Sequence, residues 1–498
     1  MKARNYLAMD FGGGSGRGML GRFDGEKLHI EELHRFPNFF VDVNGLFYWD
    51  IFRMYHHILK SLQKAREEVG KDISGIGIDT WGTDYGLLDA NGQLIGNCRC
   101  MRNASAAVSQ EVAKMIPFKE LFLKTGIQTI YGNTVFQLYE RLLHKDPALR
   151  NAQTLLMTPD LLAYFLTGQK RAEYTMATTT MLYNPTTRGW DEDIVARLKL
   201  PGHIFPEIIM PGAFSFELRR PVLEEVGLGA DTKYIPIGSH DTASAVAAAP
   251  LQAGEAFCSS GTWSLLGMES DTPVLTEEAF ETNFSNEGTV DGKIRLIKNI
   301  MGMWVLQQCR EEWARQGQKL GWDEITARAE SAPPHRHFID LENLLFYNAG
   351  NMIGKVRRYC GDTNQPVPQS VGEIARCVYE SIAMRYRLTL EQLEKVTGKT
   401  IKALRIVGGG GQNRFLNQIS ANAAGLPVLA GPVESACAGN ILLQAVTNGD
   451  LAGTSDIREV VKRSFPIEQY DPADTDRWTD AYTKYRKIID EEKGRSNQ

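Results

Sequence analysis

Two features are missing from the sequence, and each absence excludes a class of protein. No apolar run is long enough to span a bilayer, and the apolar stretch at residues 6–9 ends at Asp10, too early for the core of a secretory signal. Basic charge does not dominate, because the formal net charge is -5. This disfavours nucleic acid or an anionic membrane as a partner. We expect a cytoplasmic protein, monomer or homodimer, that binds neither.

Cysteine is scarce as well. The chain has 7 cysteines at wide spacing, and an odd, scattered set is not a disulfide framework. Cys98 and Cys100 are too close together and too isolated to form half of a zinc site. We predict reduced thiols, with a bridge between Cys360 and Cys377 left open as the alternative.

The length of 498 residues predicts two or three domains, and 43% hydrophobic with 23% charged residues is typical of a soluble enzyme. A unit of strand, glycine-rich turn and strand occurs twice, at residues 5–23 and 254–268, each time followed by mixed α/β sequence. The repeat predicts two similar α/β lobes, at 1–246 and 247–498, with a nucleotide held in the cleft between them.

Hydrophobic periodicity and capping residues predict the main elements. Asp50 is expected to cap a helix over 51–69, and a long helix is expected over 371–397. Further helices are predicted over 303–316, from 413 and over 438–447. The predicted strands cover 6–10, 18–23, 27–36, 74–80, 234–238, 254–260, 263–268, 403–407 and 427–430.

A glycine-rich turn after the first strand is the strongest local motif. Glycines let backbone N–H groups approach phosphate oxygens because no Cβ holds the phosphate away. Asp10, at the end of the strand, is a candidate for holding Mg²⁺ through water. The alternative is a tight hairpin with no ligand. The predicted phosphate-binding residues are Gly13, Gly14, Ser15, Gly16 and Arg17.

One glycine pattern is misleading. Gly16-Arg-Gly18-Met-Leu-Gly21 matches the dinucleotide fingerprint, but that motif requires a following helix, and a strand is predicted here. We also expect the adjacent His56 and His57 to be solvated.

His240, Asp241 and Thr242 follow a predicted strand. Phosphoryl transfer to a hydroxyl group needs a carboxylate beside the attacking oxygen, and Asp241 is the natural candidate for that base. The competing interpretation is an ordinary helix cap, a position that aspartate favours.

Five further positions are weaker candidates. Thr262 lies in a hydroxyl-rich turn that could form a second phosphate loop, and Gly410 lies in a glycine run where an adenosine could rest against backbone. Gly82 follows a buried strand and could line a polyol site. Asn299 and Gln307 flank a predicted helix start. An ordinary turn or linker is the alternative in each case.

Taken together and in this order, the motifs resemble those of the FGGY carbohydrate kinases, which share an actin-like, ribonuclease-H-like architecture of two lobes. The resemblance covers nearly the whole chain. The strings that carry it are Gly75-Ile-Gly-Ile-Asp-Thr-Trp-Gly82, Glu173-Tyr-Thr, Ala177-Thr-Thr-Thr180, Ser239-His-Asp-Thr-Ala-Ser-Ala-Val246, Ser259-Ser-Gly-Thr-Trp-Ser-Leu265, Lys298-Asn-Ile-Met-Gly302 and Gly431-Pro-Val-Glu434.

The resemblance implies roles for the candidate residues. Asp241 would be the general base, and the turn at 13–17 would bind ATP phosphates with Thr262. Gln307 and Gly410 would contact the nucleotide. The sugar ligands would be Gly82, His240, Asp241, Thr242 and Asn299.

Within the family the strings are most similar to members that phosphorylate L-rhamnulose, with ATP and Mg²⁺, to L-rhamnulose 1-phosphate. One departure affects this expectation: the pattern Tyr-Arg-Asp-Ser-Arg is replaced by Cys98-Arg99-Cys100-Met101-Arg102, and we interpret Met101 as standing in place of the acid. L-Fuculose or L-xylulose is therefore the alternative substrate. An actin-like ATPase without a sugar substrate is a remote alternative.

Overall fold

The computed structural model describes residues 3–496, with side chains up to residue 492. The chain divides into two compact units. Unit 1 contains the described residues up to Pro250, together with Glu269–Ile297 and Glu434–Phe465; unit 2 contains Leu251–Met268, Lys298–Val433 and the described residues from Pro466 onward. The chain first leaves unit 1 after Pro250, close to the boundary predicted at residue 246, but it then returns to unit 1 twice.

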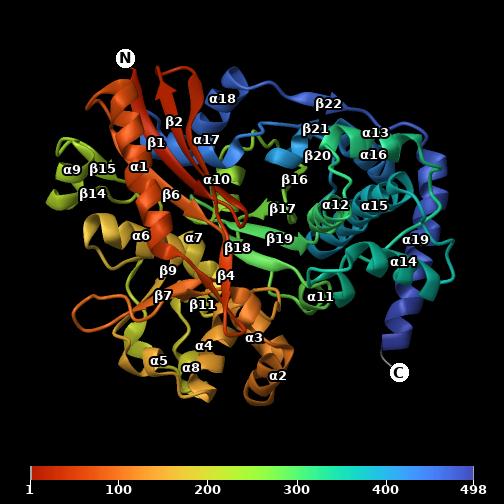
Figure 1. Cartoon of the computed structure of the whole chain (residues 1–498), viewed down its shortest axis with the longest axis horizontal. Helices are drawn as coiled ribbons and strands as arrows, with labels where there is room; N and C mark the ends of the chain where they lie inside the picture. Colours follow the sequence, from red (N-terminus) through yellow and green to blue (C-terminus); the bar gives the residue numbers. More distant parts are fainter. Residues whose placement is uncertain (1–2, 497–498) are drawn as a thin grey trace. The chain divides into compact units, whose positions relative to one another are not determined.

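Unit 1 is built on a six-stranded sheet with the order β14-β15-β6-β1-β2-β3. Strand β1 is antiparallel to β2 and parallel to β6, so that Asp10 is paired with Arg17 on one side and with Asp79 on the other. Figure 1 shows these strands side by side. Their bounds are Arg4–Phe11 for β1, Ser15–Phe23 for β2, Leu28–Pro37 for β3, Gly75–Thr80 for β6, Phe216–Glu217 for β14 and Lys233–Tyr234 for β15.

Helices cover both faces of this sheet. Alternate residues of β1 explain the arrangement: Leu7 and Met9 pack with helix α1 (Ile51–Val69), whereas Tyr6 and Ala8 pack with helix α17 (Ser435–Thr447). Because both faces are buried, β1 is apolar without interruption from Tyr6 to Met9. The other covering helices are α6 (Thr158–Thr167), α10 (Asp241–Ala247) and α18 (Thr454–Ser464).

A second, mainly helical core in unit 1 lies under the antiparallel pair β7 (Tyr85–Leu88) and β9 (Thr154–Met157). It holds Phe136 and Leu155, both fully buried. Its helices are α2 (Ala106–Met115), α3 (Phe118–Thr125), α4 (Thr134–Leu143), α5 (Pro147–Asn151) and α8 (Glu192–Arg197). Smaller elements of unit 1 include β4 (Phe40–Val43), β5 (Leu46–Trp49), β8 (Cys98–Arg99), α7 (Tyr174–Ala177), α9 (Arg220–Val226) and β18 (Ser285–Gly288).

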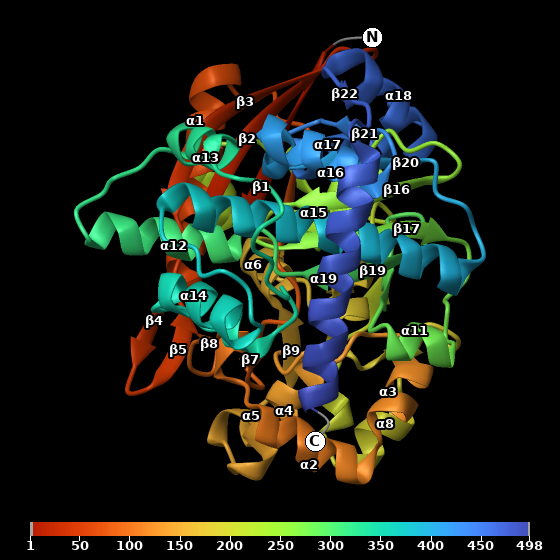
Figure 2. The ribbon, with the colours of Figure 1, turned by 90° about the vertical axis from the view of Figure 1, so that its right-hand side faces the viewer.

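Unit 2 repeats the pattern of the first hairpin. Strand β16 is antiparallel to β17 and parallel to β20, which continues to β21 and β22. Figure 2 shows helix α19 running along this unit beside α15 and α16. The strands are β16 (Glu255–Ser260), β17 (Ser264–Ser270), β20 (Ala403–Val407), β21 (Val428–Ala430) and β22 (Glu468–Tyr470); the helices are α12 (Trp304–Arg315), α13 (Trp322–Ser331), α14 (Met352–Asp362), α15 (Val371–Thr397), α16 (Arg414–Ala424) and α19 (Thr475–Ser496).

Local sequence signals located most elements correctly. Asp50 caps α1 by accepting from the backbone N–H of Arg53, and Ser370 opens α15 with a capping box. The strand predicted over 234–238 is wrong in length: strand β15 covers only Lys233–Tyr234, and beyond it the Ile235 N–H group donates to the Ile76 carbonyl at 2.9 Å. Pro236 lacks the N–H group that a continuing ladder requires.

The predicted state of the thiols is confirmed. All 7 cysteines are free and buried, Cys360 and Cys377 included. Burial raises the pKa of Cys377 well above its ordinary value, with Cys360 adding to the effect. Among the helices of the described residues, none is long and apolar enough to cross a membrane.

Candidate active site

The turn between β1 and β2 is open on its outer side. A Cβ placed on Gly13 or on Gly14 would meet nothing within 4 Å, and both residues are exposed. The turn is closed by the Gly12 N–H group, which donates to the Ser15 carbonyl at 2.9 Å. Asn38 holds its inner side by donating to the Gly12 carbonyl at 2.8 Å. The turn is thus a fixed backbone with room for a ligand over its glycines.

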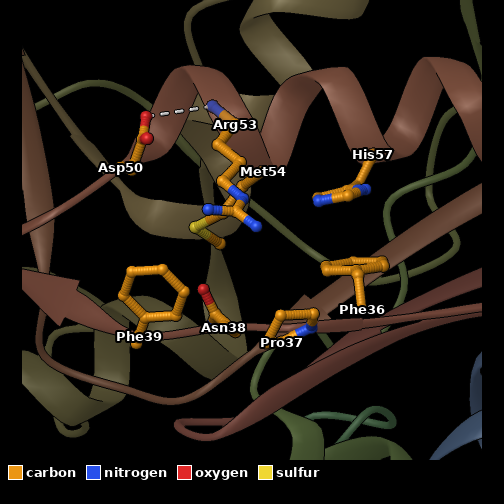
Figure 3. A pocket seen from close by; sticks show the side chains of 8 residues that line it. All are labelled: Phe36, Pro37, Asn38, Phe39, Asp50, Arg53, Met54 and His57. Carbon is orange, nitrogen blue, oxygen red and sulfur yellow. Dashed lines mark hydrogen bonds between the residues drawn. The ribbon is translucent and has the colours of Figure 1, made fainter.

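A pocket lies between the residues at the end of β3 and the first turns of α1, as Figure 3 shows. The prediction that both histidines are solvated is right for His56, which is exposed, and wrong for His57, which is half-buried: its ring stacks on Phe36 with 3.9 Å between centroids, and its pKa is lowered to about 4 by burial and by His34. Phe36 in turn blocks any side chain at Gly16, since a Cβ there would lie 2.3 Å from its ring. The aromatic pocket therefore explains why position 16 requires glycine.

Arg17 lies between two carboxylates. Its guanidinium donates to Asp10 Oδ2 and to Glu434 Oε2, and only 19% of the side chain is exposed. Glu434 precedes α17, so the end of the first hairpin is tied to a helix more than four hundred residues away in sequence. The predicted phosphate ligand is thereby held in one orientation.

Asp79 is the most deeply buried carboxylate beside this turn, with no exposed surface. Asn440 Nδ2 donates to its Oδ2 at 2.6 Å, whereas its Oδ1 has no hydrogen-bond partner among the described residues. Burial raises the pKa of Asp79 well above its ordinary value, and the carboxylate of Asp10 raises it further. Asp10 and Asp79 are opposite each other in the register of β1 and β6, and neighbouring carboxyl groups disfavour each other's ionised form.

Asp241 and His240 begin helix α10, next to the end of β6 through the bridge between Thr80 and His240. The Asp241 side chain is 34% exposed. Its Oδ1 accepts a hydrogen bond from the Thr242 hydroxyl at 3.0 Å. Burial raises the pKa of Asp241; Asp10 adds to this, while His240 and Thr242 oppose it. Asp10, Asp79 and Asp241 therefore gather at one edge of the sheet.

This set of aspartate side chains is suited to a magnesium ion whose other ligands are mostly water and phosphate oxygens. Mg²⁺ commonly takes only one or two protein carboxylates and keeps several waters. The orphaned Oδ1 of Asp79 and the adjacent Asp10 supply that chemistry. Among the described residues no three His, Cys, Asp or Glu side chains converge as a complete metal site.

Gly82 lies just beyond β6, and a Cβ there would lie 3.1 Å from Thr179. Thr83 adopts φ 74°, unusual for a β-branched residue, and it is held by Thr134, whose hydroxyl donates to the Thr83 carbonyl at 2.8 Å. Backbone held in so uncommon a conformation is typical of ligand sites.

The segment Trp81-Gly82-Thr83-Asp84 was predicted as a possible polyol site, but the sequence did not reveal that Asp84 is its buried anchor. Its Oδ2 accepts from the indole N–H of Trp49 at 2.7 Å and of Trp81 at 2.9 Å, and the two indoles lie 4.1 Å apart. Burial raises the pKa of Asp84 to about 6, against the opposing effect of Trp81 and Trp49. A signal was present, because an acid directly after Trp-Gly-Thr in an apolar context requires buried donors.

The interpretation of Met101 needs a correction. Counted along Tyr-Arg-Asp-Ser-Arg, the missing acid falls on Cys100, and Met101 takes the place of the serine. Cys100 is 2% exposed, whereas Met101 Sδ accepts a weak hydrogen bond from the Thr83 hydroxyl at 3.5 Å. Met101 thus contacts Thr83, next to Gly82, and Cys100 precedes it in the chain.

In unit 2, Thr262 lies in the turn between β16 and β17. The Gly261 N–H group donates to the Trp263 carbonyl at 2.8 Å, and Trp304 donates to the Thr262 carbonyl at 3.0 Å. The second turn is therefore joined to the start of α12, the helix that carries Gln307. Asn299, on strand β19 (Ile294–Ile300), is half-buried just before this helix.

The glycine run forms a short 3₁₀ turn, Gly409–Gln412, between β20 and α16. Gly408 has φ 83° and donates to the Pro432 carbonyl at 3.1 Å. A Cβ on Gly410 would lie 2.0 Å from Ser260 Oγ, which is buried without a hydrogen-bond partner among the described residues. Gly410 and the β16–β17 hairpin are thus in direct contact, with no room for a side chain between them.

The fold is that of the actin-like, two-domain α/β class, and the family matches identify a carbohydrate kinase within it. The chain belongs to the FGGY family of carbohydrate kinases: the model of its N-terminal domain matches residues 5–248, and the model of its C-terminal domain matches residues 256–448.

Relatives extend over nearly the full length. A rhamnulokinase of Bacteroides thetaiotaomicron is 40% identical over 488 residues, covering 98% of this chain and 99% of the relative. A rhamnulokinase of Enterococcus faecalis is 39% identical over 475 residues, covering 94% of each.

Solved structures share the fold at low identity. The ligand-bound xylulose kinase from Lactobacillus acidophilus has a TM-score of 0.82 at 17% identity and covers 98% of each chain. A Plasmodium falciparum glycerol kinase with ADP has a TM-score of 0.76 at 15% identity, with 98% of each chain covered.

Proposed function

We propose that the chain transfers the γ-phosphoryl group of ATP to L-rhamnulose and forms L-rhamnulose 1-phosphate. Similarity to rhamnulokinases over nearly the whole chain supports this substrate. The observation that carries the proposal is the Asp241 carboxylate, which begins α10 half-buried between His240 and Asp10.

Asp241 is the general base in this proposal. It accepts the proton of the attacking sugar hydroxyl as the new O–P bond forms and the bond to the ADP oxygen breaks. A raised pKa makes a carboxylate a better proton acceptor, and partial exposure leaves it accessible to the sugar. Gly82, His240, Thr242 and Asn299 are the proposed sugar ligands.

The phosphates of ATP are bound by Gly13, Gly14, Ser15, Gly16 and Arg17 in unit 1 and by Thr262 in unit 2, with Gln307 and Gly410 at the nucleoside. Asp10 would hold Mg²⁺ through water, with Asp79 beside it. When bound, the ion neutralises charge on the phosphate oxygens. Arg17 orients a terminal phosphate because both of its own carboxylate contacts fix its plane.

The experiment is coupled ADP release by the purified protein with ATP and Mg²⁺ on L-rhamnulose, L-fuculose, L-xylulose, D-ribulose and glycerol. Highest kcat/KM on L-rhamnulose supports the proposal. Highest activity on L-fuculose or L-xylulose would show that this other ketose is the substrate. Cys100 and Met101, which are not acidic, would then be the first positions to examine for the cause. ADP release independent of every sugar would instead indicate an actin-like ATPase.

A further inference from the structure

Behind the proposed base lies a buried group of charges that the mechanism above does not use. Glu287, on β18, lies directly opposite Arg295, on β19, in the antiparallel hairpin of unit 1. Glu287 Oε2 lies 3.0 Å from His240 Nδ1 and 3.3 Å from Arg295 Nη2. Both side chains therefore converge on one edge of the His240 imidazole.

All three side chains are withdrawn from water. The exposed fractions are 9% for His240, 6% for Glu287 and 0% for Arg295. Burial alone would raise the pKa of Glu287, yet His240 and Arg295 hold it below its ordinary value. Glu287 is therefore ionised, and a buried carboxylate of this kind requires hydrogen-bond donors.

The geometry fixes which nitrogen of His240 carries the proton. A carboxylate only accepts hydrogen bonds, so the short contact to Glu287 requires a proton on Nδ1. Arg295 Nη2 also lies 3.3 Å from Nδ1, but it has Glu287 Oε2 as an acceptor at the same distance. In the neutral ring Nε2 then carries a lone pair, and it lies 3.6 Å from Asp241 Oδ1.

We propose that Glu287, held by Arg295, is a positioning residue that fixes His240 as the Nδ1–H tautomer, so that Nε2 accepts a hydrogen bond from a sugar hydroxyl beside Asp241. The inference rests on the proposed function, because that hydroxyl belongs to the ketose. Asp241 and His240 would then bind the sugar as two adjacent acceptors, one of which also takes the transferred proton.

The surrounding groups are consistent with this role. The backbone N–H of His240 donates to the Thr175 hydroxyl at 3.2 Å, and Arg295 Nε donates to the Gly288 carbonyl at 2.8 Å. Asp241, Glu173 and Tyr174 are the other titratable groups that act on Arg295, and Asp10 acts on Asp241. Without Glu287, Arg295 would be the only strong partner left at Nδ1, and it can only donate.

The test compares Glu287→Ala with the conservative Glu287→Gln and with a control, Glu269→Ala. Glu269 belongs to the same unit and pairs with Arg458 at 2.7 Å, away from the site. For Glu287→Ala the KM for L-rhamnulose should rise about 5- to 100-fold, the range for a buried polar group left without its hydrogen-bond partner. The KM for ATP should stay within about twofold, as for ordinary surface changes. Glu287→Gln should recover part of the loss, since its amide oxygen can accept from Nδ1.

A second readout follows the tautomer itself. In ¹H–¹⁵N spectra of the imidazole groups, the signals lost in His240→Gln belong to His240. At pH 8 the unmodified protein should show Nδ1 protonated, and Glu287→Ala should show Nε2 protonated because Arg295 then donates to Nδ1. A role limited to folding would leave this pattern unchanged.

The outcomes separate the two proposals. Protonated Nε2 in the unmodified protein, or an unchanged sugar KM in Glu287→Ala, overturns the inference. If Glu287→Ala does not fold because Arg295 is left unpaired, the spectrum of the unmodified protein and the KM of Glu287→Gln carry the test. Absence of any ketose phosphorylation by the unmodified protein refutes the proposed function, whereas the spectrum still decides the tautomer.

Discussion

Arg17 and Asp10 face each other across the first hairpin, and the guanidinium of Arg17 donates a hydrogen bond to Asp10 Oδ2. Its other arm bonds to Glu434. The guanidinium of Arg17, which we propose binds phosphate, is therefore held in place by Asp10, which we propose holds the magnesium ion. A change at Arg17 disturbs both proposed functions at once.

Arg17→Lys should weaken binding of Mg·ADP about tenfold or more, because a lysine cannot keep the two directed contacts of a guanidinium. Titration calorimetry measures this directly. The matched control is Arg22→Lys on the same strand, where the arginine pairs with Glu31 at the surface. Equal affinity in both variants would remove Arg17 from the phosphate site.

Asp241→Asn should lower kcat about 10²- to 10⁴-fold, the usual contribution of general base catalysis, and leave Mg·ADP affinity unchanged. In the unmodified enzyme, kcat/KM for the sugar should fall as the pH falls through the raised pKa of Asp241, since a protonated carboxyl cannot accept the proton. This acid limb should lie above about 3.9, the ordinary value for aspartate. Near-normal kcat in the variant would refute the assignment.

Gly410→Ala tests the contact between the glycine run and the hairpin of unit 2. Its new methyl group would lie 2.0 Å from Ser260 Oγ, whereas a methyl group on the neighbouring Gly409 would meet nothing within 4 Å. Overpacking of this kind costs about 1–3 kcal/mol. We expect a lower Tm and weaker nucleotide binding for Gly410→Ala, with Gly409→Ala close to the unmodified protein. Indistinguishable variants would contradict the close contact.

Asp84→Asn tests the buried anchor of the segment around Gly82. The pKa of Asp84 is raised by burial to about 6 in the folded chain, above about 3.9 when unfolded. The folded state therefore holds the proton more tightly. The corresponding stability is present below pH 4 and is lost as the pH rises through 6. The shift corresponds to about 3 kcal/mol.

The asparagine variant has no such titration. Its free energy of unfolding relative to the unmodified protein should therefore improve between pH 4 and pH 7. Denaturant unfolding at several pH values measures the difference. A difference that is constant with pH would contradict the buried, titrating carboxyl.

Much of the fold could be predicted from sequence because its signals are local. Helix α15 begins and ends as predicted, at a Ser370 capping box and a Gly398 with φ 68°. The β1–β2 turn was found from its glycines. What could not be predicted were partners distant in sequence: Glu434 for Arg17, Asn440 for Asp79 and Glu287 for His240. These partners lie 417 and 361 positions away for Arg17 and Asp79, and on strand β18 for His240, so nothing in the local sequence marks them.

Discontinuous domains are a second limit. The segments Glu269–Ile297 and Glu434–Phe465 return to unit 1 although they follow the predicted boundary. Hydrophobic periodicity predicts whether a segment is a strand or a helix, but it is the same whichever unit the segment packs in. No sequence pattern therefore assigns these segments to unit 1. Both segments supply groups to the candidate site, and sequence reasoning therefore missed those groups.

The most direct test of sugar phosphorylation is ³¹P NMR of the reaction of ATP, Mg²⁺ and L-rhamnulose with the purified enzyme. We expect one new phosphomonoester signal, coupled to the two protons on C1 of the ketose, that grows together with ADP. A spectrum in which inorganic phosphate alone accompanies ADP, or in which the phosphorus couples to another carbon position, would contradict it.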